Sequence, residues 1–522
     1  MKHLNGRRVL VLGLGASGLA MARWCVGHGA RVTVWDSREQ PPRQAELKQE
    51  CPGVELIHGP LDASMLLDLH LVLKSPGLSP HDERIAPFLR AAQGDRIAVA
   101  GELDLFIRAL ADLKDEQGYA PKVLAITGTN GKTTTTSLTG LLVERCGKSV
   151  AVAGNIGPAL LDTLTQAMAA ELPEVWVLEL SSFQLDGVQG FEPSAATVLN
   201  ITQDHLDWHG DMAAYSAAKA RIFGPAPRTN DEGSTVLAST VIVLNRDDPA
   251  VREMEPAPIP VKGARGRPAR PLAREVVTFG LEAPQRPGDF GLVVEAGMAW
   301  LVRAHPQDET DRSARGAPEQ EILLQRLMPA DALRIRGRHN AANALAALAL
   351  ATSIGCPLAP MLHGLREYAG EPHRVSFVVR AAGIDTYDDS KGTNVGATVA
   401  AINGLGADRE PSRLVMLLGG DGKGQDFAPL RDPLERHARA VALYGRDAPQ
   451  LAQALDGLSH PVSRHDDLVA ATRWALAQAQ EGDAVVLSPA CASLDQFRDY
   501  RHRAEVFEAE VRAWAQDLGE VA

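Results

Sequence analysis

The sequence predicts an α/β protein with three domains. We place an N-terminal Rossmann-like domain at residues 1–101, a central phosphate-loop domain at 102–371 and a C-terminal Rossmann-like domain at 372–522. Short apolar strands alternate with helical patterns through most of the chain, which indicates mostly parallel sheets with helices on both faces. A small antiparallel sheet is also expected within the central domain. The length of 522 residues agrees with about three domains.

The first domain opens with a strand–turn–helix–strand unit. Its parts are the strand Arg8–Leu12, the turn Gly13-Leu14-Gly15-Ala16-Ser17-Gly18, a helix at 19–28 and the strand Arg31–Trp35. This glycine spacing, with an acid about 20 residues later, is typical of a diphosphate-binding unit. A nicotinamide dinucleotide and another diphosphate ligand both stay open. Asp36, followed by Ser37 and Arg38, would contact a ribose or a base, or else cap the strand end.

A Gly-rich turn in the second domain carries the most specific motif. It follows the apolar residues 123–126 and reads Thr127-Gly128-Thr129-Asn130-Gly131-Lys132-Thr133-Thr134, ahead of a helical segment at 137–143. Backbone N–H groups and the helix start attract phosphate, Lys132 reaches the β- and γ-phosphates, and the Thr133 hydroxyl can bind Mg²⁺. The usual loop has glycine where this chain has Ile126, so Gly128 supplies the flexibility. We predict a nucleoside-triphosphate site; an ordinary strand-to-helix turn is the alternative.

Three more side chains of the central domain are candidates for ligand binding. Glu179 ends the apolar strand Val175–Glu179, and a carboxylate in that place beside a phosphate loop usually holds Mg²⁺; a solvated loop acid is the alternative. His205 follows a strand at 196–200 and is a candidate metal or phosphate ligand, or a structural histidine. Lys219 lies on an Ala-rich helix at 214–223, whose pattern alone predicts a solvated lysine.

The remaining segments comprise a polar stretch before the phosphate loop, a region of irregular composition and the third domain. A polar stretch at 112–122 leads into the phosphate-loop strand, and residues 251–330 are interpreted as antiparallel strands with surface loops at 257–274 and 305–319. The third domain has predicted strands at 384–387, 414–418, 440–444 and 484–487. Lys391, Lys423 and Ser493 lie in turns after three of these strands, and carboxyl ends of parallel strands form the usual ligand crevice.

Composition narrows the class of protein. The net charge of −12 argues against a nucleic-acid binder, which needs a basic face. The five cysteines are scattered without a CxxC pair, so we expect a reducing compartment, no disulfide framework and no thiolate zinc site. The glycine spacing near the N-terminus argues against a signal peptide, and no later segment is apolar enough to span a bilayer. A monomeric cytoplasmic protein without membrane insertion is expected.

The phosphate loop resembles that of the Mur ligases and the folylpolyglutamate synthetases. Further matching motifs lie, in order, at 154–157, 178–185, 204–205, 337–340, 372–374 and 389–391. Within the family, the turn at 13–18 and the runs at 487–493 and 495–497 resemble the D-glutamate-adding member. The resemblance covers nearly the whole chain, although residues 251–330 look longer and looser than the family pattern. Ala504 after Arg503 is a departure, because the family often has glycine there.

The resemblance implies a role for each matching residue. The catalytic residues would be Lys132, His205 and Lys219. ATP would contact Gly128, Thr129, Asn130, Gly131, Lys132, Thr133, Thr134, Asn340, Asn343, Arg374 and Asp389. The uridine diphosphate substrate would contact Gly15, Ala16, Ser17, Asp36, Ser37, Arg38, Gly77, Asn155 and His205. D-glutamate would contact Lys391, Thr393, Lys423, Ser493, Leu494 and Tyr500. Two Mg²⁺ ions would be held by Thr133, Glu179, His205 and Lys219, the last as a CO₂-derived carbamate.

The implied reaction is ATP-driven amide formation in peptidoglycan precursor synthesis. The carboxylate of UDP-N-acetylmuramoyl-L-alanine would attack the γ-phosphate, and the amine of D-glutamate would then displace phosphate from the acyl phosphate. Each substrate would bind a different domain, so the C-terminal domain is expected to close on the others. A sister ligase, or one like folylpolyglutamate synthetase, with another amino acid is the alternative. A nicotinamide-dependent oxidoreductase leaves the phosphate loop unexplained, and a regulatory nucleotide-binding module leaves Lys391, Lys423 and Ser493 unexplained.

Overall fold

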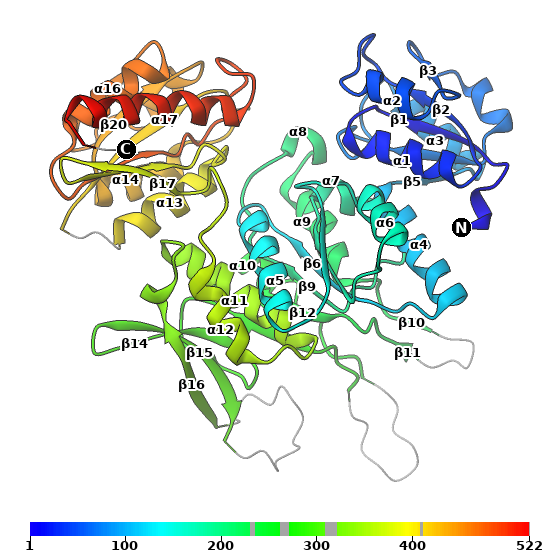
Figure 1. Cartoon of the computed structure of the whole chain (residues 1–522), viewed down its shortest axis with the longest axis horizontal. Coiled ribbons are helices and arrows are strands. Elements are labelled where there is room, and N and C mark those ends of the chain that lie inside the picture. Colours follow the sequence, from blue (N-terminus) through cyan, green and yellow to red (C-terminus); the bar gives the residue numbers. More distant parts are fainter. Residues whose placement is uncertain (230–234, 261–270, 308–320, 408–410, 521–522) are drawn as a thin grey trace.

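The chain folds into three lobes, each built on its own sheet (Figure 1). The computed structural model describes residues 1–229, 235–260, 271–307, 321–407 and 411–520. The N-terminal and C-terminal lobes stand on either side of Figure 1 with the central lobe below them. The three-domain α/β architecture predicted from the sequence is therefore confirmed. The predicted loops at 257–274 and 305–319 lie mostly outside the described residues.

The N-terminal lobe is a parallel sheet in the order β3-β2-β1-β4-β5. Its strands are β1 (Arg8–Leu12), β2 (Arg31–Trp35), β3 (Glu55–Ile57), β4 (Leu71–Lys74) and β5 (Ala98–Ala100), and its helices are α1 (Ala16–Gly27), α2 (Gln44–Glu50) and α3 (Ala86–Gly94). The turn between β1 and α1 is tight, because a Cβ on Gly18 would lie 1.9 Å from the Gly13 carbonyl oxygen. The helix consequently begins at Ala16, three residues before the predicted start.

The central lobe holds a parallel sheet in the order β13-β12-β9-β6-β8-β7. Its strands are β6 (Lys122–Thr127), β7 (Val150–Gly154), β8 (Val175–Glu179), β9 (Ala195–Val198), β12 (Val241–Asn245) and β13 (Val276–Phe279). Its helices are α4 (Glu102–Gln117), α5 (Lys132–Arg145), α6 (Leu160–Ala169), α7 (Ser182–Leu185), α8 (Leu206–His209), α9 (Met212–Ala220), α10 (Pro249–Arg252), α11 (Arg338–Ser353) and α12 (Leu358–Glu367). The phosphate loop joins β6, an interior strand, to α5.

Most of the polar stretch predicted at 112–122 is helical. Its first six residues complete α4, whose apolar face buries Leu103, Phe106 and Leu113. Polar residues gather only in the last turns, where the helix ends at Gly118 in a left-handed conformation with φ +71°. The stretch leads into β6, as expected, and it is polar because it includes the exposed end of an amphipathic helix.

Short antiparallel strands extend the central lobe. They are β10 (Arg228–Thr229) with β11 (Thr235–Val236), and the three-stranded sheet of β14 (Phe290–Glu295), β15 (Met298–Pro306) and β16 (Ile322–Pro329). The sheet of β14 to β16 lies within residues 251–330, where antiparallel strands were predicted, whereas β13 of the same range pairs in parallel with β12. These strands lie at the lower end of the molecule in Figure 1, away from the two upper lobes.

The C-terminal lobe has a six-stranded sheet in the order β17-β18-β22-β19-β20-β21. Its strands are β17 (Ser376–Ala381), β18 (Ile384–Asp388), β19 (Leu414–Gly419), β20 (Ala438–Tyr444), β21 (Val462–Arg464) and β22 (Ala484–Leu487). Its helices are α13 (Val395–Ala407), α14 (Arg431–His437), α15 (Ala448–Ala454), α16 (Leu468–Gln478) and α17 (Tyr500–Asp517). Strand β17 pairs antiparallel with β18, whereas β18 to β21 pair in parallel. No helix in the described ranges is both long and apolar enough to cross a membrane.

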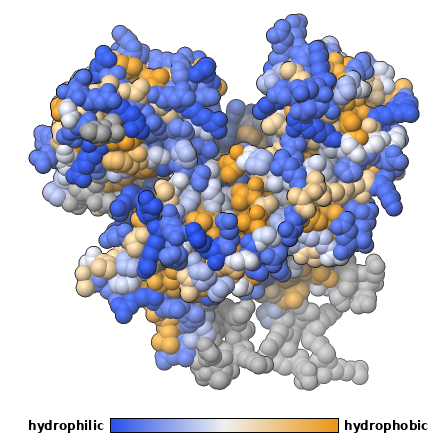
Figure 2. Space-filling view, viewed as in Figure 1, coloured by the Kyte–Doolittle hydropathy of each residue, from blue (hydrophilic) through white to orange (hydrophobic). Residues whose placement is uncertain are grey.

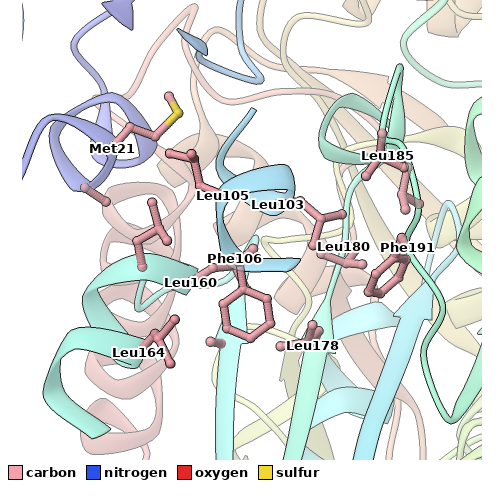
Figure 3. Packing of buried hydrophobic residues seen from close by; sticks show 14 of the residues in the cluster. Met21, Leu103, Leu105, Phe106, Leu160, Leu164, Leu178, Leu180, Leu185 and Phe191 are labelled. Carbon is pink, nitrogen blue, oxygen red and sulfur yellow. The ribbon is translucent and has the colours of Figure 1, made fainter. Parts of the chain in front are cut away.

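The N-terminal and central lobes share an apolar core, whereas the C-terminal lobe has its own. One cluster runs from α1 of the N-terminal lobe through α4 and α6 to the central sheet, and Figure 3 shows Met21, Leu105, Phe106, Leu160 and Leu178 packed within it. The C-terminal lobe has two clusters of its own, whose members all lie between residues 375 and 515. Within the described residues, no apolar cluster crosses from the C-terminal lobe to the central one. A shared core fixes two lobes together, whereas polar contacts allow relative motion.

Candidate active site

The phosphate loop is shaped by two glycines. Gly128 has φ +151° and Gly131 has φ +83°. A Cβ on Gly128 would lie 2.9 Å from the Cβ of Leu199, and one on Gly131 would lie 2.6 Å from Asn343 Oδ1, so both positions require glycine. The Lys132 ammonium group donates to two carbonyl oxygens of the loop at 2.9 Å. The usual loop has a glycine where this chain has Ile126. Here Gly128 serves instead, and its surroundings leave no room for a side chain.

Lys219 is buried beside this loop, contrary to the solvated lysine predicted from the helix pattern alone. The residue is 2% exposed, and its Nζ donates to Gly128 O at 2.9 Å. The same nitrogen lies 4.7 Å from the centre of the Tyr215 ring. Burial, reinforced by the charge of Lys132, lowers the pKa of Lys219 well below its usual value. A lower pKa raises the fraction of the neutral amine, which is the form of lysine that can add CO₂.

Glu179 presents an unshared oxygen near the same lysines. Its Oε1 accepts a hydrogen bond from Asn155 Nδ2 at 2.8 Å, while Oε2 is buried and has no hydrogen-bond partner in the described part of the chain. A buried carboxylate oxygen without a partner is costly unless a cation binds it. Oxygen ligands are those that Mg²⁺ prefers, so this donor fits a magnesium ion.

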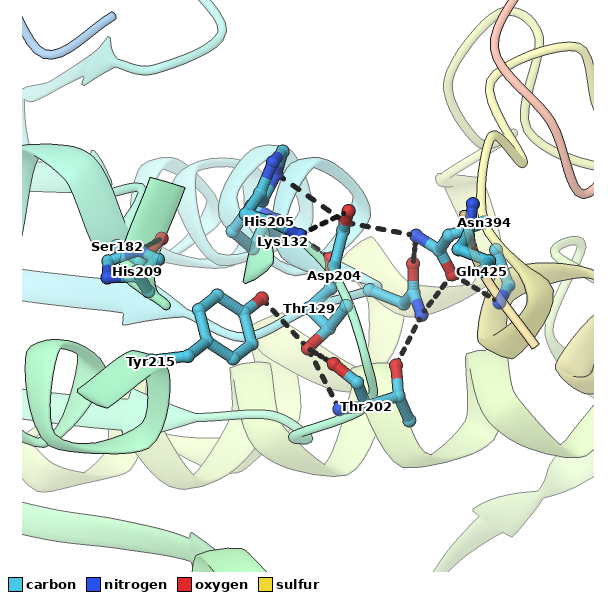
Figure 4. A network of polar contacts seen from close by, with 12 residues as sticks. Thr129, Lys132, Ser182, Thr202, Asp204, His205, His209, Tyr215, Asn394 and Gln425 are labelled. Carbon is cyan, nitrogen blue, oxygen red and sulfur yellow. Dashed lines mark hydrogen bonds and ion pairs between the residues drawn. The ribbon is translucent and has the colours of Figure 1, made fainter. Parts of the chain in front are cut away.

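His205 lies near Lys132 and Lys219, and its backbone is strained, with φ +54°. Its Nε2 lies 3.5 Å from Asp204 Oδ2, as Figure 4 shows. Burial lowers the pKa of His205 below 6.5, and the charge of Lys132 adds to this effect, although Asp204 opposes it. A lower pKa favours the neutral imidazole, which is the form that can bind a metal.

A cavity of about 220 Å³ lies between the central and C-terminal lobes, next to the phosphate loop. Its lining includes Gly131, Thr134, Asn340, Asn343, Arg374 and Asp389, all of which were predicted to contact ATP. Arg374 crosses between the lobes and donates to Thr133 Oγ1 at 2.7 Å. Burial raises the pKa of Asp389 to about 7. A hydrogen bond from Ser488 at 2.7 Å lowers the pKa but only partly offsets the effect of burial.

The predicted diphosphate turn of the N-terminal lobe is organised around Asp36. This carboxylate accepts hydrogen bonds from Leu14 N at 2.7 Å and from the Arg38 side chain at 2.8 Å. Burial would raise the pKa of Asp36, but these hydrogen bonds outweigh it and lower the pKa to about 2. Ser17 on α1 contacts Glu102, and Ser37 and Gly77 are exposed.

A larger cavity, of about 790 Å³, lies between the N-terminal and central lobes. Lys74 and Pro76, just before the exposed Gly77, line it on one side, and Phe183 and Gln184 of α7 line it on the other. Burial lowers the pKa of Lys74 to about 8. The molecule therefore has room for an extended substrate along the seam of the first two domains. Figure 2 shows that the surface is also hollowed between the N-terminal and C-terminal lobes.

The predicted amino-acid residues lie on three neighbouring turns of the C-terminal sheet. Lys391 Nζ lies 5.5 Å from the centre of the Tyr500 ring, and burial together with Arg374 lowers the pKa of Lys391 to about 8. Two backbone hydrogen bonds between Asp421 and Ala492 join the turn of Lys423 to the turn of Ser493 and Leu494. Ser493 is 4% exposed and Leu494 69%. Thr393 lies two residues beyond Lys391 on the first turn.

Arg503, whose role the sequence did not predict, links these three turns. Its guanidinium is fully buried and donates to the carbonyls of Ser390, Cys491 and Gly419 at 2.7, 3.0 and 3.5 Å. A signal was present in the sequence, because Arg503 is the first of four positions spaced four apart along α17. The other three, Phe507, Val511 and Ala515, are all buried.

Asn394 and Asp204 are two further residues to which the sequence assigned no role. Both belong to the polar network of Figure 4, in which Asn394 of the C-terminal lobe reaches Asp204 of the central lobe at 3.4 Å. Signals were present in the sequence, because Asp204 lies in the matching motif at 204–205 and Asn394 directly follows Thr393. The contact itself joins residues 190 apart, which a single sequence does not reveal.

Known proteins match this chain from end to end. The matching family models are a Mur ligase MurD-like N-terminal domain at 7–101, a Mur ligase middle domain at 126–262 and a Mur ligase glutamate ligase domain at 373–491. A protein of Albidiferax ferrireducens named UDP-N-acetylmuramoylalanine–D-glutamate ligase is 58% identical, over 100% of this chain and 98% of its own. One of the same name from Burkholderia pseudomallei is 56% identical, over 98% of each chain.

Solved structures share the fold at low identity. The MurF ligase of Thermotoga maritima in complex with ADP has a TM-score of 0.55 at 15% identity, covering 98% of this chain and 99% of that one. The UDP-N-acetylmuramate-alanine ligase MurC of Thermotoga maritima has a TM-score of 0.53 at 19% identity, with the same coverage. The domain matches and the full-length identity with named relatives agree with the phosphate loop and the turns described above. The chain therefore belongs to the Mur ligase family, within the group of UDP-N-acetylmuramoylalanine–D-glutamate ligases.

Proposed function

We propose that the protein is an ATP-dependent ligase that joins D-glutamate to UDP-N-acetylmuramoyl-L-alanine and releases ADP and phosphate. The observation that carries this proposal is the identity of 56–58%, over essentially the whole length, with relatives of that name. The site has the parts that such a reaction needs: a phosphate loop, a cavity shared with the C-terminal lobe and lysine-bearing turns beyond it. We propose domain limits at 1–101, 102–371 and 372–522, which the family-model matches support.

ATP would lie across the cavity of about 220 Å³, with its phosphates at the loop. The loop N–H groups, Lys132 and the start of α5 would hold the phosphates. Asn340, Asn343 and Asp389 would contact the nucleoside, and the contact of Arg374 with Thr133 brings a second cation to the γ-phosphate end. Lys132 and Arg374 would offset the repulsion between the substrate carboxylate and the γ-phosphate that it attacks.

Thr133, Glu179, His205 and carbamylated Lys219 would hold two Mg²⁺ ions. Bound magnesium would supply charge neutralisation at the phosphates. The unshared Oε2 of Glu179 and the lowered pKa of His205 support this assignment. The lowered pKa of Lys219 supports its carbamylation, in which the neutral amine adds CO₂ and releases one proton. The carbamate replaces a buried amine with an oxygen ligand suited to a hard metal.

The uridine diphosphate would bind at the turn of Gly15, Ala16 and Ser17, together with Ser37, Arg38, Gly77 and Asn155. Asp36 uses both carboxylate oxygens within the protein, so it would shape this turn by holding Leu14 and Arg38. From there the substrate would follow the seam between the first two domains toward the phosphate loop. Its carboxylate would then face the γ-phosphate.

D-glutamate would bind among the three turns that Arg503 links. Lys391 and Lys423 would pair with its carboxylates, Thr393 and Ser493 would donate hydrogen bonds, and Leu494 and Tyr500 would line the pocket. The pocket would hold the amine of D-glutamate next to the acyl phosphate. This alignment would favour attack of the nitrogen on the acyl carbon and departure of phosphate.

Phosphate release tests the substrate assignment directly. With ATP, Mg²⁺ and UDP-N-acetylmuramoyl-L-alanine, we expect release with D-glutamate and none above background with L-lysine or meso-diaminopimelate. The relevant difference is the amino-acid pocket, because the other two substrates are common to every arm. Release with either diamino acid and none with D-glutamate would identify a sister ligase and refute the proposal.

The pKa of Lys391 predicts a pH limit on the use of D-glutamate. A lysine whose pKa is lowered to about 8 loses its charge as pH rises through 8, and the attraction for a substrate carboxylate disappears with it. We expect kcat/KM for D-glutamate to fall above pH 8 by up to about tenfold per pH unit. In Lys391→Arg, whose guanidinium stays charged, the fall should move to higher pH. The same break in both enzymes would show that another group is responsible.

A further inference from the structure

The helix α13 of the C-terminal lobe begins against the phosphate loop. Asn394, the residue before this helix, is 5% exposed and uses every hydrogen-bonding site of its amide. Its Oδ1 accepts from Ala397 N at 2.9 Å and from Asn130 Nδ2 at 3.2 Å. Its Nδ2 donates to Asn130 Oδ1 at 3.0 Å and to Asp204 Oδ2 at 3.4 Å. The two asparagines therefore form a reciprocal amide pair, one member of which lies in the phosphate loop.

Both sides of this contact are held in place by their own domain. The backbone of Asn130 exchanges two hydrogen bonds with the Asn200 side chain, at 2.8 and 3.0 Å. On the other side, Gln425 Oε1 accepts from Val395 N at 3.0 Å, and Figure 4 shows Gln425 beside Asn394. The pair thus joins the phosphate loop to the start of α13, and each of these is held by hydrogen bonds within its own domain. A shift of one domain would therefore displace the other at this contact.

Gly396 shows how close the two lobes lie here. A Cβ on Gly396 would be 2.7 Å from Thr202 Oγ1 and 3.3 Å from Asn130 Nδ2, so any larger residue would push the helix away from the loop. The contact matters because no described apolar cluster joins these lobes. Polar contacts at the loop, together with the packing of α13 against α11, therefore hold the C-terminal lobe in this position.

We propose that Asn394 is a positioning residue that latches the amino-acid pocket onto the phosphate loop. The proposal rests on the proposed function, because it takes Lys391 and Thr393 to hold the amino acid and the loop to hold the phosphates. Asn394 follows these two residues on the same turn, so the amide pair sets the distance between the incoming amine and the acyl phosphate. The latch acts on the reaction through alignment and touches no reacting atom.

The substitution Asn394→Asp tests the contact between the domains without disturbing the start of α13. The new carboxylate can still accept from Ala397 N, and aspartate is a good residue at a helix start, so α13 should keep its stability. It cannot donate to Asn130, and it would face the carboxylate of Asp204, which lies 3.4 Å from the amide nitrogen it replaces. The variant therefore keeps the cap and turns the latch from attraction into repulsion.

The effect is measured in the full-length enzyme, with Asn403→Ala as matched control. Asn403 lies on the same helix, about 13 Å further along at 1.5 Å per residue. For Asn394→Asp we expect kcat/KM for D-glutamate to fall about 10- to 100-fold, with Tm within about 2 °C of wild type. Small-angle X-ray scattering with ADP should show a larger radius of gyration than for the wild type. Asn403→Ala should stay within twofold of wild type and keep its radius.

A charge swap supplies the rescue. In Asn394→Asp with Asp204→Asn, the amide and the carboxylate exchange places, so attraction returns. We expect the double variant to lose less activity than the product of the two single losses and to regain the smaller radius.

Three results would overturn the latch: kcat/KM of Asn394→Asp within twofold of wild type, a radius unchanged from wild type, or a large drop in Tm that marks a folding role. A wild-type protein that releases no phosphate with D-glutamate would overturn the proposed function alone, because the scattering measurements still decide the latch.

Discussion

Lys219→Ala is expected to lose activity by about 10³-fold. The proposed carbamate on this side chain is an oxygen ligand for magnesium at the γ-phosphate, and loss of one such electrostatic contribution costs 10²- to 10³-fold or more. The side chain is also buried at 2% exposure between Gly128 and Tyr215, so its removal leaves a cavity beside the loop. Initial rates at saturating substrate, with Tm measured alongside, separate loss of chemistry from loss of stability.

The cavity provides the decisive control for the carbamate. A small carboxylate such as acetate or formate fits where the lysine was and can supply the missing oxygen ligand, so it should restore part of the activity of Lys219→Ala. The wild type and Lys148→Ala, whose lysine pairs only loosely with Glu174 at 3.9 Å, should gain nothing. Full activity of Lys219→Ala without additives would exclude the carbamate, and an inactive variant that no carboxylate rescues would argue against an oxygen ligand at this place.

Lys132→Met is expected to reduce kcat by at least about 10³-fold. Its ammonium group would neutralise charge at the γ-phosphate, and methionine keeps the length of the side chain without the charge. The loop should keep its shape, because Gly128, Gly131 and the Asn130–Asn200 hydrogen bonds stay in place. ADP affinity measured by calorimetry should therefore fall much less than kcat.

Lys122→Met is the matched control for that variant. Lys122 opens the strand whose far end leads into the phosphate loop, and it is exposed. We expect its kcat within twofold of the wild type. A Lys132→Met enzyme that keeps a tenth or more of wild-type kcat would show that the charge at the γ-phosphate comes chiefly from elsewhere, with Arg374 the first candidate.

The interior of each sheet was predictable from sequence. Strands β1, β2, β8 and β22 have the predicted bounds, because buried parallel strands are mostly apolar runs that end at a polar residue or a glycine. The antiparallel strand β17 and the short β21 were missed. Strand β17 alternates buried and exposed residues irregularly, and β21 has only three residues, so neither has a clear period.

The site was predictable as motifs but not as an arrangement. The phosphate loop and Glu179 follow from local patterns, since glycines, a lysine and a strand-end acid have recognisable spacing. Lys219 did not, because nothing in an Ala-rich helix tells which face is covered; only the family resemblance gave it a role. The Asn130–Asn394 pair joins residues 264 apart, so it exists only through the docking of two domains.

The divided wall of the nucleotide cavity has a thermodynamic consequence. Gly131 and Asn343 contribute one side and Val375, Asp389 and Ala400 the other, so the cavity of about 220 Å³ is complete only while the lobes are docked. Any molecule that fills it favours docking, and docking in turn would bring the residues proposed to bind the amino acid up to the phosphate loop. Linkage requires the two affinities to change by the same factor. A nucleotide analogue and D-glutamate should therefore each tighten the binding of the other, although they need never touch.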